Sequence, residues 1–301
     1  MQPSLLSPIR GMTAPARGAA WMIAAAVAFS LMTWAIRELA PIAASEVIFL
    51  RSLLGLFLVL PWLRLPEGRL LRRPRIGIFC LRAGFSYAAM LAWFYAIQHV
   101  VLADGVALQF TLPLFTILFA ILIFKEPVGF RRWTATVIGF AGALIIIRPG
   151  FTAIDGATVL VIVSAALYGA ANMAVRYLSR REQAQTLVFY LHALTLPLAL
   201  GGAIPYWIWP GWADVPWIIV LGVTGTLAHY CFARSMAIAD ASVVMPFDYL
   251  RLPMLAAVGY LAYDEQATVW TWVGALVICS STFYIVRRES QIARAAERDR
   301  A

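Results

Sequence analysis

The chain has 301 residues, of which 62% are hydrophobic and 13% are charged, and its mean hydropathy is +0.80. Soluble domains are about 45–50% apolar and about 25% charged, so the composition excludes an ordinary soluble protein and indicates a membrane protein. The net charge of +9 does not indicate nucleic-acid binding, because most Lys and Arg residues lie in the tails and in short links between apolar segments. The three cysteines fall inside apolar segments without metal-ligand spacing, so no metal site is expected.

Ten apolar segments follow one another along the chain. They lie at about residues 19–36, 43–63, 76–97, 102–124, 132–147, 156–175, 185–208, 215–237, 241–262 and 267–286. The segments are continuous and lack the dyad alternation of outer-membrane strands, so they predict an all-α polytopic membrane fold with ten transmembrane helices. Very short links join the third segment to the fourth and the eighth to the ninth, and these pairs are expected to form tight hairpins.

The distribution of arginine predicts the orientation of the chain. Residues 1–18 precede the first apolar segment without a small-residue cleavage site, so we interpret them, like residues 289–301, as a cytoplasmic tail. Ten crossings place both ends on one side, and 18 of the 24 Lys and Arg residues lie in the tails and links of that side. The positive-inside rule then predicts a multi-pass protein of the bacterial plasma (inner) membrane with both termini cytoplasmic.

Two parts of the chain resemble each other at one offset. Residues 25–40 read AAVAFSLMTWAIRELA, and the stretch that begins 139 positions later reads SAALYGAANMAVRYLS. That offset pairs Phe29 with Tyr168, Thr33 with Asn172, Arg37 with Arg176, Glu126 with Glu265 and Trp133 with Trp272. We therefore predict two copies of one five-helix unit, at residues 19–149 and 150–288. Because five is an odd number, the second copy enters the membrane from the other side, so the halves are inverted repeats.

Short motifs occur in the same order in both halves. The first half contains Ala103-Asp104-Gly105, Leu112-Pro113, Lys125-Glu126-Pro127, Arg132-Trp133 and Arg148-Pro149-Gly150, and the second contains Ala239-Asp240-Ala241, Leu252-Pro253, Asp264-Glu265 and Trp272-Val273-Gly274. With this pattern the chain resembles an EamA-type member of the drug/metabolite transporter superfamily from about residue 19 to residue 288. The resemblance implies a secondary transporter that exports amino acids or similar small metabolites by alternating access through a central cavity. It leaves open a carrier for S-adenosylmethionine or for a toxic, drug-like compound.

Transporters built from inverted repeats bind substrate near the membrane midplane, where the halves meet. Aromatic, amide, sulfur and imidazole side chains in the segments expected there are the candidate substrate-binding residues: Phe29, Tyr87, Met90, Phe94, Gln109, Tyr168, Asn172 and His229. The same residue types also occur as ordinary helix-packing residues, so both interpretations stay open.

Charged residues inside the segments are costly and need partners. Three of them are expected to tune the charge of the cavity: Arg82, Asp248 and Arg251. Asp248 and Arg251 lie three positions apart on one helix face, where they either pair with each other or separate to bind an amine and a carboxylate. Arg82 either extends to cytoplasmic headgroups or lines an inner vestibule. Arg51 is expected to pair with a neighbouring helix.

Other classes of function find little support in the chain. HExxH, GxSxG and paired membrane aspartates are absent, so neither an intramembrane enzyme nor a catalytic residue nor a cofactor is expected. No segment shows a filter-like run, which disfavours a channel, and no Walker motif indicates ATP use. Proton coupling, exchange and facilitated diffusion stay open. The glycines of the fifth and tenth segments suit packing within one chain or in a homodimer, and the expected partners are a small-molecule substrate and lipid.

Overall fold

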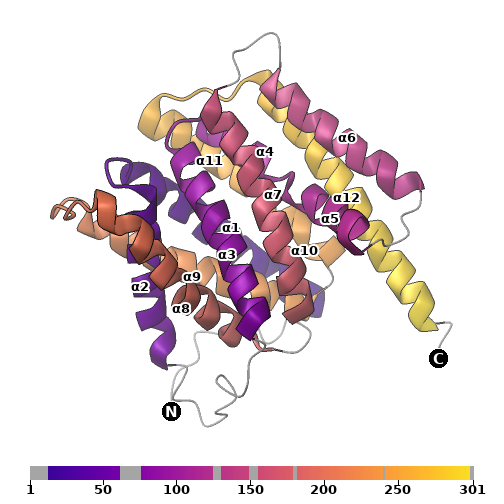
Figure 1. Cartoon of the computed structure of the whole chain (residues 1–301). Helices are drawn as coiled ribbons and strands as arrows, with labels where there is room; N and C mark the ends of the chain where they lie inside the picture. Colours follow the sequence, from indigo (N-terminus) through magenta and orange to yellow (C-terminus); the bar gives the residue numbers. More distant parts are fainter. Residues whose placement is uncertain are drawn as a thin grey trace.

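The computed structural model describes residues 13–61, 76–124, 130–148, 155–178, 182–239 and 241–298. In these residues all regular secondary structure is helical, which confirms the predicted all-α class (Figure 1). The helices are α1 (Ala14–Glu38), α2 (Ala44–Val59), α3 (Ile76–Ile97), α4 (Leu102–Gln109), α5 (Leu112–Phe124), α6 (Phe130–Ile147), α7 (Gly156–Leu178), α8 (Ala184–Ala203), the 3-10 helix η4 (Ile204–Tyr206), α9 (Val215–Ile238), α10 (Ala241–Asp248), α11 (Arg251–Tyr263) and α12 (Val269–Arg298).

Six stretches are long and apolar enough to cross a membrane: Ala14–Glu38, Ile76–Ile97, Leu102–Phe119, Gly156–Val175, Gln185–Tyr206 and Val215–Ile238. Two shorter apolar helices, Trp133–Ile147 and Val269–Ile285, accompany them. Helices satisfy all backbone hydrogen bonds internally, which lipid requires. Together with α2 and the α10–α11 pair, these elements account for the ten predicted segments.

The fourth and ninth segments are each broken into two helices, whereas the sequence predicts continuous ones. The first break lies between α4 and α5, and the second lies at the equivalent place between α10 and α11. Proline lacks an N–H, and Pro113 and Pro253 lie in the first turns of α5 and α11, where no helical bond is lost. At the first break the Thr111 hydroxyl donates to the Leu108 carbonyl oxygen at 2.7 Å. Discontinuous helices of this kind often border the binding site of a transporter.

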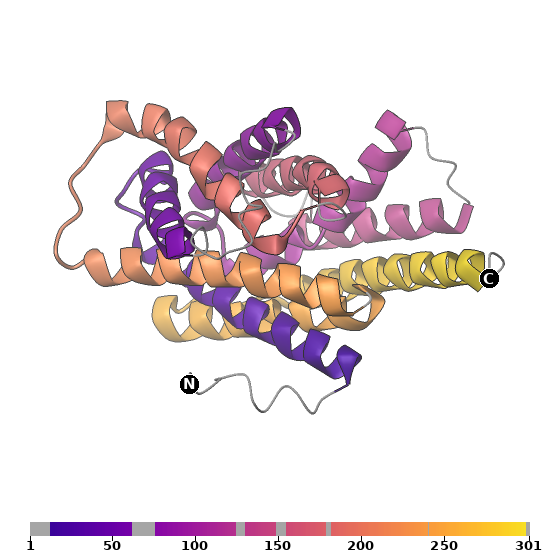
Figure 2. The ribbon, with the colours of Figure 1, turned by 90° about the horizontal axis from the view of Figure 1, so that it is seen from below.

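The helix pairs follow a two-fold pattern. Helix α1 of the first half packs against α9 of the second, and α7 of the second half packs against α3 of the first (Figure 2). The equivalent helices α2 and α8 pack against each other, and so do α6 and α12, which lie side by side in Figure 1. The halves are therefore interleaved, and most interhelical surfaces join one half to the other.

Helices α6 and α12 approach each other at two glycines. A Cβ atom added to Gly142 would lie 2.9 Å from the Gly274 carbonyl oxygen, and one added to Gly274 would lie 2.6 Å from the Gly142 carbonyl oxygen. These glycines thus pack within one chain, which is one of the two arrangements that the sequence allows.

The terminal helices extend past the predicted boundaries of the tails. Helix α1 begins at Ala14, although the sequence predicts its start near residue 19, and α12 continues to Arg298, past the predicted end near residue 286. The early start has a packing reason, because a Cβ atom on Gly18 would lie 2.5 Å from the Ala239 Cβ. Residues 1–12 and 299–301, Glu126 and the side chain of Arg176 lie outside the described part of the structure.

Candidate substrate-binding site

Arg51 lies in the middle of α2 and faces the second half of the protein. The residue is 1% exposed. Its Nη1 lies 3.0 Å from the Met90 Sδ on α3, and its Nη2 lies 3.4 Å from the His229 Nδ1 on α9. A Cβ atom added to Gly225 would lie 2.6 Å from the Arg51 Nε, so only glycine leaves room for this guanidinium. Arg51 lies in the middle of α2, and Met90 and His229 lie in the second half of α3 and α9, so the cluster lies inside the bundle between the two halves of the chain.

The His229 ring is fixed by its own helix. Its Nδ1 lies 2.8 Å from the Gly225 carbonyl oxygen, which only accepts, so the proton of the neutral ring resides on Nδ1. The ring also meets Phe29 of α1 edge-on, with ring centroids 5.2 Å apart and an interplanar angle of 69°. Because Nδ1 donates to Gly225, it offers no lone pair to Arg51.

Tyr168 and His192 lie on two further helices of the second half. Tyr168 of α7 packs against the main hydrophobic core. The His192 ring of α8 lies against Gly55, one turn along α2 from Arg51. His192 is 1% exposed, and its Nδ1 has no hydrogen-bond partner. In the described residues no carboxylate forms an ion pair with Arg51.

Asp248 and Arg251 form the internal pair that is one of the two predicted arrangements. The Arg251 Nη2 lies 2.6 Å from the Asp248 Oδ2. Asp248 ends α10 and Arg251 begins α11, so the pair bridges the break in the ninth segment. The Arg251 guanidinium carbon lies 5.1 Å from the centre of the Phe29 ring, which connects this pair to the Arg51 cluster. The buried Asp248 Oδ1 has no partner.

The remaining predicted residues lie elsewhere. Phe94 is 1% exposed and belongs to the main hydrophobic core. Tyr87 packs on that core, with its hydroxyl against Gly202 of α8. Gln109 is buried at the end of α4, and its Oε1 lacks a partner. Asn172 lies half-buried one turn after Tyr168.

Arg82, the third residue expected to tune charge, is held inside the protein. Its side chain is buried, and its Nη1 donates to the Leu187 carbonyl oxygen of α8 at 2.9 Å. Arg82 also interacts electrostatically with His192. It therefore adds positive charge to the same side of the helix bundle as Arg51.

The structure thus brings three of the predicted residues together, because Met90 and His229 contact Arg51 and Phe29 contacts His229. The sequence interpretation assigned Arg51 to structural pairing. It did not single out Gly225. The sequence does not distinguish Arg51 from the other membrane arginines, because Arg82 and Arg234 likewise have no acidic residue three or four positions away.

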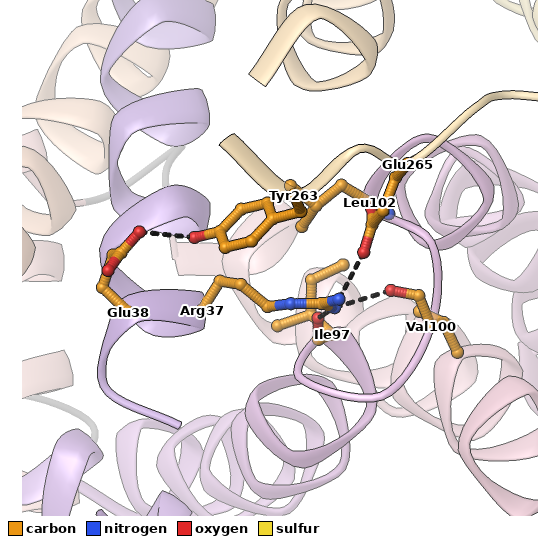
Figure 3. A network of polar contacts seen from close by, with 7 residues as sticks. All are labelled: Arg37, Glu38, Ile97, Val100, Leu102, Tyr263 and Glu265. Carbon is orange, nitrogen blue, oxygen red and sulfur yellow. Dashed lines mark hydrogen bonds and ion pairs between the residues drawn. The ribbon is translucent and has the colours of Figure 1, made fainter. Parts of the chain in front are cut away.

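A second polar group joins the halves at the membrane face where α1, α3 and α11 end. We call Arg37, Glu38, Tyr263 and Glu265 the clasp (Figure 3). Arg37 forms an ion pair with Glu265 and donates to the Val100 carbonyl oxygen at 2.7 Å. The Tyr263 hydroxyl donates to the Glu38 Oε1 at 2.7 Å. The clasp therefore links the two halves where these helices end.

Glu265 also caps α4. Its Oε2 accepts a hydrogen bond from the Leu102 backbone N–H at 2.8 Å, where the helix dipole favours negative charge. Asp264, just before it, has a left-handed backbone with φ of 54° and ends α11. This turn directs Glu265 towards the first half of the protein.

A cavity of about 330 Å³ lies near the end of α8. It is lined by Leu200, Ile204, Trp207 and Trp209. Trp209 is 83% exposed, and tryptophan is typical of the membrane interface. None of these residues belongs to the Arg51 cluster, so this hollow is not the candidate site.

Two interleaved halves with equivalent broken helices, and polar groups held between the halves, are typical of membrane transporters. The chain matches the EamA-like transporter family twice, over residues 16–148 and 156–287, and it belongs to that family. Its relatives in the drug/metabolite transporter superfamily are transporters of small metabolites, so this protein is a multi-pass membrane transporter and not an enzyme.

Two similar proteins are riboflavin transporters. The chain is 31% identical to that of Vibrio cholerae, over 93% of this chain and 96% of the other. It is 32% identical to that of Rhizobium johnstonii, over 90% and 91%. The S-adenosylmethionine uptake transporter of Rickettsia prowazekii is 25% identical over 82% and 84%. A crystal structure with 16% identity superposes with a TM-score of 0.63, covering 91% of this chain and 98% of that one, which shows the fold alone.

Proposed function

We propose that this transporter carries riboflavin, or a closely similar heteroaromatic metabolite, across the bacterial inner membrane. The observation that carries the proposal is the cluster between the halves in which Arg51 contacts Met90 and His229, and the His229 ring contacts Phe29. Aromatic rings and a thioether suit a flat apolar ring system. A guanidinium suits the carbonyl oxygens at one edge of such a ring. The similarity to riboflavin transporters supports the same substrate.

Alternating access gives this arrangement a mechanism. The clasp links the halves at the ends of α1 and α11 (Figure 3), and our proposal is that it keeps this face closed in one of the two states. If both termini are cytoplasmic, as the arginine distribution predicts, this is the periplasmic face. Transport then requires the Arg37–Glu265 pair to separate while the opposite face closes. Such a carrier works in either direction according to the gradients.

Other substrates find less support in the site. Export of amino acids, which the sequence resemblance implies, would use Asp248 and Arg251 for the two charged groups, but these residues are paired with each other. S-adenosylmethionine carries a sulfonium cation, which Arg51 and Arg82 would repel. Riboflavin has no charge to repel and several oxygen acceptors.

The test is uptake into proteoliposomes that contain the purified protein. Riboflavin, S-adenosylmethionine and the twenty amino acids are supplied separately, with protein-free liposomes as the control. We expect saturable riboflavin uptake above the control. Uptake of amino acids or of S-adenosylmethionine without uptake of riboflavin would show that the proposed substrate is wrong.

A further inference from the structure

Arg51 is a buried cation whose charge the described protein does not balance. Its contacts on α3 and α9 are a thioether and a histidine. Its Nε has no hydrogen-bond partner, although the residue is 1% exposed. A lone ion in a low-dielectric interior costs several kcal/mol, and protein residues usually offset this cost with a carboxylate. No carboxylate does so here among the residues that the structure describes.

The neighbours of Arg51 are poor acceptors. The sulfur of Met90 accepts only weakly. The Nδ1 of His229 donates to the Gly225 carbonyl oxygen at 2.8 Å, so at 3.4 Å it presents a hydrogen rather than a lone pair to Arg51. Arg82, a second buried cation, donates to the Leu187 carbonyl oxygen of the neighbouring helix α8 at 2.9 Å and adds positive charge to the bundle. The site therefore has donors in excess, and the missing component is an acceptor.

The position of Arg51 fits an acceptor that enters from outside the protein. Arg51 is on α2 of the first half, while His229 belongs to the second, so relative movement of the halves changes its surroundings. Gly225 of α9 leaves space for the Arg51 guanidinium but forms no hydrogen bond with it. An arginine that only stabilised the fold would be expected to have a fixed acceptor partner.

On the assumption of the proposed function, we propose that Arg51 determines specificity by binding the oxygen-acceptor edge of the transported molecule with its planar fork of N–H donors. For a flavin this edge is the carbonyl-bearing ring, and for other metabolites it is a carboxylate. Two parallel hydrogen bonds from a guanidinium fit either group, whereas a lysine ammonium cannot make the same pair. Phe29 and Tyr168 then contact the rest of the molecule.

The experiment compares Arg51→Gln and Arg51→Lys with the wild type, with Arg234→Gln as the matched control. Arg234 is likewise an arginine inside a membrane segment, that of α9, but it is exposed and lies over the Tyr230 ring. Riboflavin binding is measured from riboflavin fluorescence, which gives the Kd. Uptake is measured at several riboflavin concentrations, which gives the KM. Hydrogen bonds to a charged group contribute about 1.5–3 kcal/mol, so we expect the Kd and KM of Arg51→Gln to rise at least tenfold. Arg51→Lys should be intermediate, and Arg234→Gln should match the wild type.

Thermal unfolding separates recognition from a structural role. Removal of an unbalanced cation should leave the Tm of the ligand-free Arg51→Gln variant unchanged or higher, while riboflavin should no longer raise it. A lower Tm with the riboflavin-induced shift retained, or an unchanged KM, would overturn the inference while the proposed function stands.

A second pair of ligands separates this inference from the choice of riboflavin. If the wild type does not bind riboflavin, N-acetylmethionine and its uncharged amide are compared. If the wild type binds the carboxylate more tightly than the amide and Arg51→Gln abolishes this difference, the role of Arg51 is supported and riboflavin is rejected as substrate. Equal binding of the acid and the amide, in wild type and variant alike, would overturn the role of Arg51.

Discussion

Arg37 and Glu265 lie 228 positions apart, in opposite halves of the chain, and form an ion pair at one membrane face. Each also holds backbone groups of a third element, because Arg37 donates to the Ile97 carbonyl oxygen at 2.5 Å and Glu265 accepts from the Leu102 N–H at 2.8 Å. Three separate parts of the fold are therefore joined by two side chains (Figure 3). Such a joint is suited to hold one conformation of a carrier closed.

The clasp should behave as one unit in mutants. Arg37→Gln and Glu265→Gln each leave a partly buried charge unpaired, so we expect each to lower the riboflavin uptake rate about tenfold or more. The double variant should be no worse than the more impaired single variant, with a coupling energy of about 1–3 kcal/mol. Uptake rates of the four proteins measure this cycle. Strictly additive losses would show that the two residues act independently.

Gly225 should be indispensable for the position of Arg51. An alanine there would place its Cβ 2.6 Å from the Arg51 Nε, so the guanidinium must move. We expect Gly225→Ala to raise the riboflavin KM as Arg51→Gln does, and to cost about 1–3 kcal/mol of stability by overpacking. Gly84→Ala on α3 is the matched control, because nothing lies within 4 Å of its added Cβ. Equal KM values for the two variants would contradict this packing argument.

The pairing of Asp248 with Arg251 predicts a structural effect. Asp248→Asn removes the partner 2.6 Å from Arg251, and loss of one member of a buried pair costs about 3–5 kcal/mol at most. Arg251 is partly exposed, so a smaller loss in thermal stability is expected. The double variant Asp248→Asn with Arg251→Gln should recover part of that loss. A change in substrate preference without any change in Tm would instead indicate that this pair binds substrate.

The two breaks and the Arg51 cluster show where sequence reasoning reached its limit. Apolar length, positive-inside bias and the repeat identify ten segments and two halves, since these depend on composition along the chain. From the sequence, Pro113 predicts only that one backbone carbonyl loses its hydrogen-bond donor. Proline is tolerated both within a kinked helix and at the start of a new helix, so it does not distinguish the two. The sequence therefore predicts a weak point without showing that the helix ends there.

The site residues depend on contacts between distant helices. Phe29 and Tyr168 were found because the repeat aligns them, and His229 because it is a polar residue in an apolar segment. Arg51 was assigned a structural partner, which is the usual case for a membrane arginine. Only the packing of α2 against α3 and α9 shows that its neighbours are a thioether and an imidazole N–H.

One pH effect is expected outside the membrane segments. Hydrogen bonds from the hydroxyl and backbone N–H of Thr158 lower the pKa of Asp155, which precedes α7. A lowered pKa adds stability above the unfolded pKa of about 3.9, and this stability is lost as the pH falls through the folded value. Asp155→Ala should thus lower the Tm slightly at pH 7. The difference from wild type should shrink at acidic pH, and a constant difference would argue against the charged cap.

The predicted orientation has its own test. Reporter fusions at residues 1 and 301 should both give cytoplasmic signals, because ten crossings return the chain to the side on which it began. Signals on opposite faces would require an odd number of crossings. That result would leave the membrane face of the clasp unassigned, and it would contradict the inverted repeat.

The most direct measurement of the central claim is riboflavin counterflow in proteoliposomes. Vesicles are loaded with unlabelled riboflavin, and the entry of a trace of labelled riboflavin is followed over time. A carrier with one binding site between two moving halves should show a transient accumulation of label that disappears in empty vesicles and saturates with concentration. Entry that is the same with and without internal riboflavin, or no entry at all, would contradict the account.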